Sequence, residues 1–222
     1  MSTTRRSFVT KVTAGATGVL ALPGFVPADL RAFAASQGSS WDTSWTTKLT
    51  GRHKACFDCT EPESGYGVWR ASAWVGQYGD VFKTAPADMS PVIVLRHNAI
   101  ILAMQQAFWD RYGIGKMKGI THPLTEQPTD RNPALLDEKD GIPAPFNQAG
   151  LHKQLARGVV ALACNLALQD LVALIAKADH IDDAAAGKKA VGYLVPGVVL
   201  QPSGVFAAIR AQEAGCSYLK AS

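Results

Sequence analysis

The sequence predicts a single α/β domain built as three layers around a mostly parallel, five-stranded sheet. The clearest evidence is Val159 to Cys164, six apolar or small residues without a polar break, which is typical of a strand buried on both faces. Apolar residues then recur three and four apart from Ala167 to Ala178, which indicates a helix. The same alternation of strand and helix runs along the whole chain. Helices between successive strands favour parallel pairing with right-handed crossovers, and hence helices packed on an open sheet.

The amino half supplies two strands and two helices. His53 to Cys59 reads as the first strand, and apolar residues three and four apart from Val68 to Phe82 predict an amphipathic helix. Val92 to Leu95 reads as a second buried strand. Apolar positions from Ile101 to Phe108 predict a second helix, and Gly113 is expected to end it.

Residues 113–150 form an irregular insert. The segment holds five prolines and five glycines and has no sustained period. So long an irregular stretch within a compact domain is typically a lid, an oligomer contact or a disordered insert. The sequence leaves these three alternatives open.

The carboxyl third completes the strand–helix pattern. After the strand at 158–163 and its helix, Asp179 to Lys189 reads as a polar linker, and Val191 to Gln201 as an apolar strand. A last helix is expected from Val205 to Glu213 with Ser203 as its N-cap, and a final strand from Cys216 to Lys220.

Residues 1–34 are predicted to be a twin-arginine signal peptide. Arg5 and Arg6 precede a mildly apolar run rich in Gly and Ala, and Ala32-Phe33-Ala34 offers small residues at a cleavage site. We therefore expect passage through the twin-arginine (Tat) translocon, removal of the segment and a periplasmic location. The alternative is an uncleaved membrane tether.

Residues 35–51 are expected to form an N-terminal arm lying on the domain that begins at residue 52. This segment is rich in Ser, Thr and Trp, and Trp41 and Trp45 would anchor it.

The charge argues against a nucleic-acid partner. The formal net charge is +4, but four basic side chains and one acidic side chain within the first 34 residues account for +3, which leaves +1 for the remainder. A chain without a basic patch lacks the electrostatic footprint of a nucleic-acid-binding protein.

The carboxyl third resembles the DsrE/DsrF-like sulfur-relay family. The residues that carry the resemblance are Gly158 to Asn165, Pro202 to Val205 and Gln212 to Tyr218. The resemblance implies a small flavodoxin-like three-layer fold for residues 52–222 and assembly into trimers or hexamers. It also implies, as in some members of the family, persulfide transfer on the cysteine at the position of Cys164.

Cys164 is the candidate nucleophile. It stands where a strand passes into a helix, and the free amides and dipole of a helix N-terminus favour a thiolate. Asn165 could donate a hydrogen bond to the sulfur, and His97 could lie nearby as a cation. The alternative is a small apolar residue filling a buried sheet. We expect Cys164 rather than Cys216 to be the reactive thiol, because Cys216 begins a strand at the opposite edge.

Cys56 and Cys59 form a C-x-x-C pair. The pair could be a disulfide, a metal or redox site, or two inert thiols. Attachment of a c-type haem is excluded because Thr60 stands where the motif requires histidine.

A metal site is also conceivable at the carboxyl edge of the sheet. In a flavodoxin-like strand order of 2-1-3-4-5, Cys59, His97 and Cys164 would lie along one edge and could bind zinc or copper. His122 in the insert is a candidate fourth ligand. His97, Asn98 and Asn165 at the same edge are candidate ligand-binding residues.

Two functions therefore remain open. The first is a periplasmic, sulfur-handling or thiol-redox protein that uses Cys164. The second is a non-catalytic module that binds a metal, a small ligand or a partner on the same fold. The helix after Cys164 is apolar nearly all round, which predicts a homo-oligomer.

Overall fold

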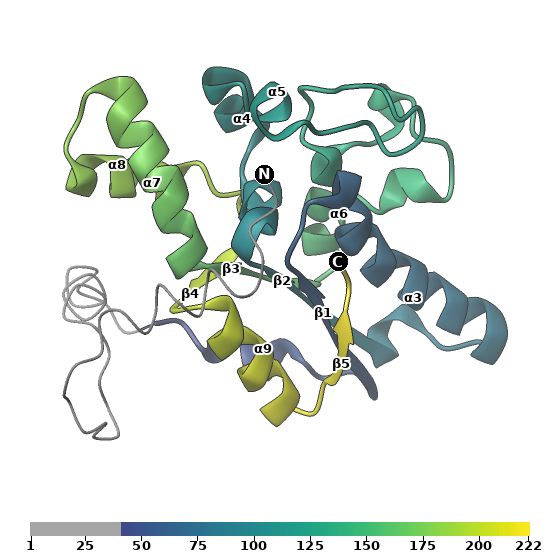
Figure 1. Cartoon of the computed structure of the whole chain (residues 1–222). Helices are drawn as coiled ribbons and strands as arrows, with labels where there is room; N and C mark the ends of the chain where they lie inside the picture. Colours follow the sequence, from purple (N-terminus) through teal and green to yellow (C-terminus); the bar gives the residue numbers. More distant parts are fainter. Residues whose placement is uncertain (1–40) are drawn as a thin grey trace, which may run out of the picture. The chain divides into compact units, whose positions relative to one another are not determined.

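The computed structural model describes residues 41–222. The predicted signal peptide, residues 1–34, and the first six residues of the predicted arm lie outside this part. The sheet has five parallel strands: β1 (His53–Cys59), β2 (Met89–Leu95), β3 (Val160–Cys164), β4 (Val199–Gln201) and β5 (Ser217–Lys220). The predicted α/β class with a parallel five-stranded sheet is confirmed (Figure 1).

The strand order is β4-β3-β2-β1-β5, which corrects the expected order 2-1-3-4-5. The first three strands are neighbours as expected, but β2 occupies the centre of the sheet rather than β3. β2 is buried at all seven positions, as a central strand covered on both faces should be.

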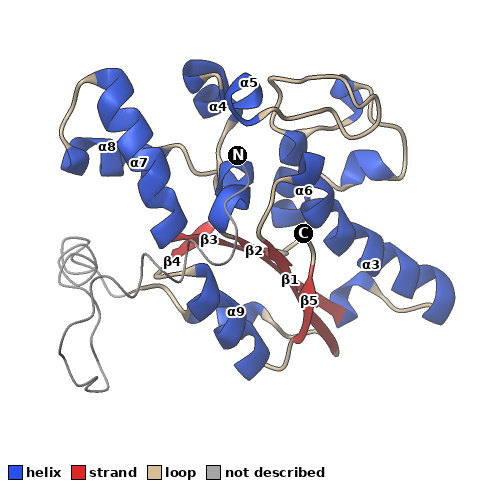
Figure 2. Ribbon diagram, viewed as in Figure 1, coloured by secondary structure: helices blue, strands red, loops and turns tan. Residues whose placement is uncertain are grey.

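The strand order explains how the helices divide between the two faces of the sheet. The chain steps from β1 to β2, β3 and β4 in one direction, so right-handed crossovers place all of these connections on one face. The return from β4 to β5 runs in the opposite direction and places α9 (Gly204–Glu213) on the other face. Figure 2 shows α9 alone below the sheet and the other labelled helices above it.

Two apolar clusters correspond to the two faces. The larger cluster packs the sheet against the first set of connections, and includes Phe57, Cys59 and Leu168. The smaller cluster packs Val94, Leu162 and similar residues against α9 and against Trp45 of the arm. Residues of β1 alternate between them, since Cys56 belongs to the smaller cluster and Phe57 to the larger.

The remaining elements are mostly short helices. They are η1 (Ser44–Lys48), η2 (Glu63–Gly65), α3 (Tyr66–Phe82), η3 (Pro86–Asp88), η4 (His97–Ala103), α4 (Gln106–Tyr112), α5 (Ile114–Lys118), η5 (Pro133–Leu135), η6 (Glu138–Asp140), η7 (Phe146–Gln148), α6 (Leu151–Ala156), α7 (Asn165–Asp179) and α8 (Asp183–Gly192). No helix in the described residues is both long and apolar enough to cross a membrane.

Three predicted elements are corrected. The supposed linker at 179–189 is largely helical, because Asp182 caps α8 by accepting a hydrogen bond from the backbone N–H of Ala185. The strand at 191–201 is reduced to the three residues of β4. The second helix is divided into η4 and α4, which ends at Gly113 as expected.

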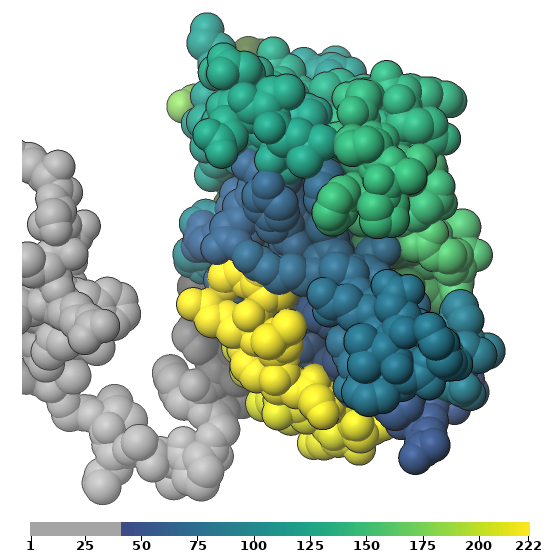
Figure 3. Space-filling view, turned by 90° about the vertical axis from the view of Figure 1, so that its right-hand side faces the viewer, coloured from purple at the N-terminus to yellow at the C-terminus, as the bar shows by residue number. Residues whose placement is uncertain are grey.

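The insert at 113–150 is part of the domain. The insert contributes Ala134 of η5, and Leu136 and Ile142 from its loops, to the larger apolar cluster. Figure 3 shows this region, in teal and green, packed directly against α3. Of the three alternatives for the insert, disorder is therefore the one that the structure contradicts.

Helix α7 obtains much of its cover from within the chain. Leu168, Leu171 and Ile175 are buried, and α8 packs along the helix. Leu166 remains 45 % exposed. Because the chain itself covers most of the apolar residues of α7, this helix does not require a partner subunit. The homo-oligomer stays a prediction.

Candidate functional site

Cys164 occupies the junction of β3 and α7. It is the last residue of the strand and the N-cap of the helix, and its Sγ accepts a hydrogen bond of 3.4 Å from the backbone N–H of Ala167. The residue is 6 % exposed. The predicted position at a strand-to-helix junction is therefore confirmed. The sulfur accepts a hydrogen bond from one of the backbone amides of the first helical turn, which otherwise have no partner within the helix.

This junction is also the topological switch point of the sheet. The chain leaves β3 towards α7 on one face and leaves the neighbouring β4 towards α9 on the other. Open α/β sheets bind ligands outside the carboxyl ends of two such strands. Cys164 pairs in register with Gln201, the last residue of β4, so both lie at this point.

Gln201 is buried and incompletely paired. It is 0 % exposed, and its Nε2 donates to the backbone oxygens of Asp42 and Leu200 at 2.7 and 3.0 Å. Its Oε1 has no hydrogen-bond partner among the described residues. An acceptor without a partner is thus present one strand away from the thiol.

Asn165 does not act as predicted. No hydrogen bond joins its side chain to Cys164 within the described residues; its backbone oxygen and its Oδ1 instead accept from Nε2 of Gln169, at 3.2 and 3.4 Å. The side chain is almost fully buried. The backbone amide of Ala167 takes the place that was expected for Asn165, because an N-cap side chain naturally faces the first free amides of its own helix.

His97 and Asn98 form a surface cluster with Glu61. The Nδ1 of His97 lies 3.2 Å from Oε1 of Glu61, and Nδ2 of Asn98 donates to Oε2 at 2.8 Å. The His97 side chain is 66 % exposed. Both residues lie just beyond the carboxyl end of β2, as predicted, but the partner of His97 is this carboxylate rather than the thiol.

The predicted metal set is not brought together. In the part of the chain that the structure describes, no group of three or more His, Cys, Asp or Glu is placed to hold a metal ion. Cys59 lies under α3, where a Cβ added to Gly67 would stand 2.6 Å from its Sγ. His122 accepts backbone hydrogen bonds from Leu124 and Thr125 within the insert. The described structure therefore does not bring together the residues of the predicted zinc or copper site, Cys59, His97, Cys164 and His122.

The disulfide between Cys56 and Cys59 is also absent. Both thiols are free, and they point to opposite faces because β1 continues unbroken to Cys59. Burial raises the pKa of each of these thiols to about 12. Burial likewise raises the pKa of Cys216. These three thiols are therefore held in their neutral form.

A second polar cluster at this edge was not predicted. Asp58 is 1 % exposed and receives two hydrogen bonds of 2.7 Å from Nε and Nη2 of Arg96, and a third of 2.7 Å from the hydroxyl of Tyr218. The bond to Asp58 raises the pKa of Arg96 and of Tyr218. An acidic residue within an otherwise apolar strand was the signal that could have revealed this cluster, since a buried charge requires a partner.

Arg96 also packs against the start of α9. A Cβ added to Gly204 would lie 2.4 Å from Cβ and Cδ of Arg96. The glycine therefore lets the arginine stem cross the first turn of the helix while its guanidinium group reaches Asp58. A cavity lies elsewhere, at the amino edge of the sheet between α3 and α6.

Neither the models of known protein families nor the curated proteins give a match to this chain. The resemblance to the DsrE/DsrF-like family thus stays a prediction.

Proposed function

We propose that the chain is an exported, DsrE-like thiol protein in which Cys164 handles sulfur. The observation that carries the proposal is the placement of Cys164 as the N-cap of α7 at the switch point of the sheet. Of the four thiol sulfurs, that of Cys164 is the one that accepts a hydrogen bond from a backbone amide. A donated amide and a helix N-terminus favour the thiolate, which is the nucleophilic form.

The reaction proposed is transfer of sulfur from a persulfide donor. The Cys164 thiolate attacks the terminal sulfur of the donor, and a new sulfur–sulfur bond forms at Cys164. The sulfur–sulfur bond of the donor breaks, and its electron pair leaves with the donor as a thiolate. No net oxidant or reductant is consumed, so the step requires only a persulfide and an accessible thiolate.

Mass spectrometry of natively exported protein tests the proposal. We expect one added sulfur atom on the wild type and on Cys216→Ser, and none on Cys164→Ser. Cys216 is a matched control because it is equally buried at the opposite edge. An unmodified wild type after incubation with a persulfide donor would contradict the proposal.

Competitive alkylation of the reduced, folded protein gives a second test. Cys164 should label faster than Cys216 at neutral pH, and the ratio of the two rates should fall as the pH is raised. If Cys164 labels only after unfolding, its burial, with 6 % of the residue exposed, keeps reagents away from the sulfur, and the thiol is structural. The protein is then a binding module on the same fold, a candidate that the unpartnered Oε1 of Gln201 favours.

Export is tested through the paired arginines. Replacing both Arg5 and Arg6 by lysine should leave the precursor in the cytoplasm, because the Tat translocon reads the arginine pair itself. Lys11→Gln is the control, as it removes a charge outside the pair. Cell fractionation followed by immunoblotting measures the distribution, and periplasmic recovery of the double variant would contradict the assignment.

A further inference from the structure

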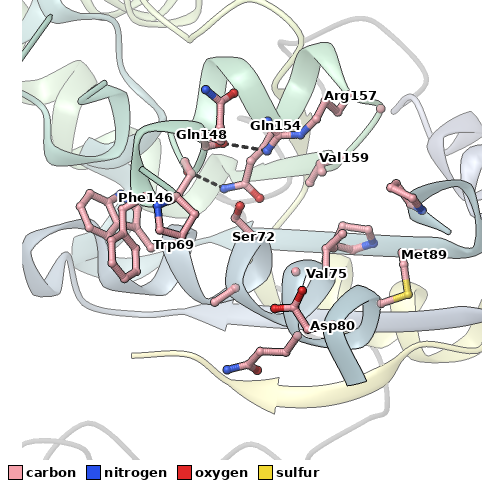
Figure 4. Close-up of a pocket in the computed structure, with 18 residues that line it drawn as sticks. Trp69, Ser72, Val75, Asp80, Met89, Phe146, Gln148, Gln154, Arg157 and Val159 are labelled. Atoms are coloured by element: carbon pink, nitrogen blue, oxygen red, sulfur yellow. Dashed lines mark hydrogen bonds between the residues drawn. The ribbon is translucent and has the colours of Figure 1, made fainter. Parts of the chain in front are cut away.

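A cavity of about 580 Å³ lies at the amino edge of the sheet, at the opposite end of the strands from Cys164. Met89, which opens β2, and Val159, which precedes β3, line it together with residues of α3 and α6 (Figure 4). The five residues of β3 separate this edge from Cys164 by about 13 Å at 3.3 Å per residue. Its volume lies in the range of small-molecule sites.

One stripe of α3 forms the wall of the cavity. Trp69, Gly76 and Asp80 follow one another at spacings of seven and four residues, which places them on one face of the helix. The ring of Phe146 stacks on that of Trp69 with a centroid distance of 5.7 Å and an interplanar angle of 18°. The result is a flat aromatic surface at one end of an otherwise largely apolar space.

Two polar atoms of residues that line the cavity are buried without a partner. They are Nε1 of Trp69, a donor, and Oε1 of Gln154, an acceptor. Among the described residues only four buried side-chain polar atoms lack a partner, and half of them belong to residues that line this cavity. Such groups are uncommon, and each calls for a specific explanation.

The orientation of the Gln154 amide is fixed. Its Nε2 donates to the backbone oxygens of Val68 and Ala149 at 2.9 and 2.6 Å. Exchanging the amide oxygen and nitrogen would break both bonds, so Oε1 must stay the unpaired atom. Figure 4 shows the amide reaching from α6 towards Ser72 on α3, across the space between the two helices.

The charged groups of the wall favour a ligand without net charge. Asp80 and Arg157 are the only charged side chains among the described residues that line the cavity, and they are of opposite sign; Arg157 donates to the backbone oxygen of Gln148 at 2.7 Å. We infer that this cavity binds a flat, uncharged and largely apolar ring compound that carries one hydrogen-bond acceptor for Trp69 Nε1 and one donor for Gln154 Oε1. This site goes beyond the proposed thiol function and does not depend on it.

The test uses 2-quinolone, a flat ring compound with an N–H donor and a carbonyl acceptor, and its N-methyl derivative, which lacks the donor. Titration calorimetry on the full mature chain measures both. We expect 2-quinolone to bind with a dissociation constant of about 1 mM or below. The N-methyl compound should bind at least threefold more weakly, because Oε1 of Gln154 then remains unpaired.

The matched variants are Gly76→Leu and Gly79→Leu. A Cβ added at Gly76 meets nothing within 4 Å, so a leucine there extends into the cavity, whereas Gly79 lies on the same helix but does not line it. Gly76→Leu should weaken binding at least tenfold, and Gly79→Leu and Cys164→Ser should leave it unchanged. Thermal unfolding verifies that both leucine variants fold.

Several outcomes would overturn the inference. If neither compound binds the wild type at about 1 mM, the unpaired atoms are served by water alone. Equal affinities of the two compounds would remove the role of Gln154, and equal affinities of the two leucine variants would remove the cavity as the site. Loss of binding in Cys164→Ser would place the ligand at the other edge.

Discussion

Most of the buried polar groups at the carboxyl edge of the sheet are paired, with Oε1 of Gln201 as an exception, whereas the amino edge holds an open cavity whose lining carries two unpaired polar atoms. At the carboxyl edge Arg96 and Tyr218 satisfy the buried Asp58, and Ala167 donates to Cys164. At the amino edge Trp69 and Gln154 keep unpaired atoms. Open α/β sheets usually combine reactive groups and ligand space at one edge. In this protein the candidate nucleophile and the cavity at the amino edge are about 13 Å apart along β3, so each can be altered without the other.

The largest effect expected from breaking this contrast is that of Asp58→Ala. The substitution leaves the guanidinium of Arg96 and the hydroxyl of Tyr218 without their shared acceptor, and should cost about 3 kcal/mol of unfolding free energy. Asp80→Ala at the amino edge is the control, because its side chain is exposed, and should stay within about 0.5 kcal/mol. Urea unfolding measures the unfolding free energy of both variants. Similar losses for Asp58→Ala and Asp80→Ala would contradict the difference between the two edges.

Replacing a glycine by alanine should have opposite effects on the unfolding free energy at the two edges of the sheet. Gly204→Ala places a Cβ against the pinned stem of Arg96 and should destabilise the protein by about 1–3 kcal/mol. Gly76→Ala has open space in the middle of α3 and should stabilise it by about 0.5–1 kcal/mol, since alanine favours helix. Thermal melts of the two variants distinguish these signs. Stabilisation by Gly204→Ala would mean that Arg96 moves aside freely.

The pH dependence sharpens the same contrast through Tyr218→Phe. The bond to Asp58 raises the pKa of Tyr218 above its unfolded value of about 10, so its contribution is complete below that pH and is lost as the pH rises through the folded pKa. The variant should lose about 1 kcal/mol at pH 7 and approach the wild type above pH 10. Both proteins share a decline above pH 9 as the unfolded chain releases the protons of Cys56 and Cys59. Urea midpoints at several pH values measure the difference in stability between the variant and the wild type. A difference that stays constant with pH would contradict the prediction.

The smallest effect is expected at the rim of the carboxyl edge. His97→Ala removes an exposed contact with Glu61 and should change the unfolding free energy by less than about 0.5 kcal/mol. The same variant should leave the alkylation rate of Cys164 unchanged, because His97 pairs with Glu61. A slower rate would restore His97 as a cationic neighbour of the thiol.

The sequence alone predicted those elements that are specified by a short, continuous run of residues. β1, the end of α4 at Gly113 and the cap of α9 by Ser203 follow from short runs of residues, and the structure confirms all three. Helix α8 was missed because its composition is polar, although Asp182 followed by alanines carried a capping signal. Strand order could not be read, because the alternation of strands and helices is the same for several orders.

The candidate sites were only partly predictable for a related reason. The position of Cys164 depends on one strand and the helix that follows it, so it was found. The predicted metal set required three strands and the insert to converge, and the alternation of side chains along β1 turned Cys59 towards α3 instead. The cavity was not predicted at all, since Trp69 and Gln154 come together only through packing between segments more than eighty residues apart.

The strand order also has a consequence for how the chain folds during its synthesis. β1, the first strand to leave the ribosome, borders β5, which is made some 160 residues later. Until then one side of β1 keeps its backbone groups unpaired, and Asp58 lacks the hydroxyl of Tyr218. Contacts this distant in sequence slow folding and expose the nascent chain to aggregation. We therefore expect chains truncated before Ser217 to depend on chaperones, because β1 then lacks its neighbour β5.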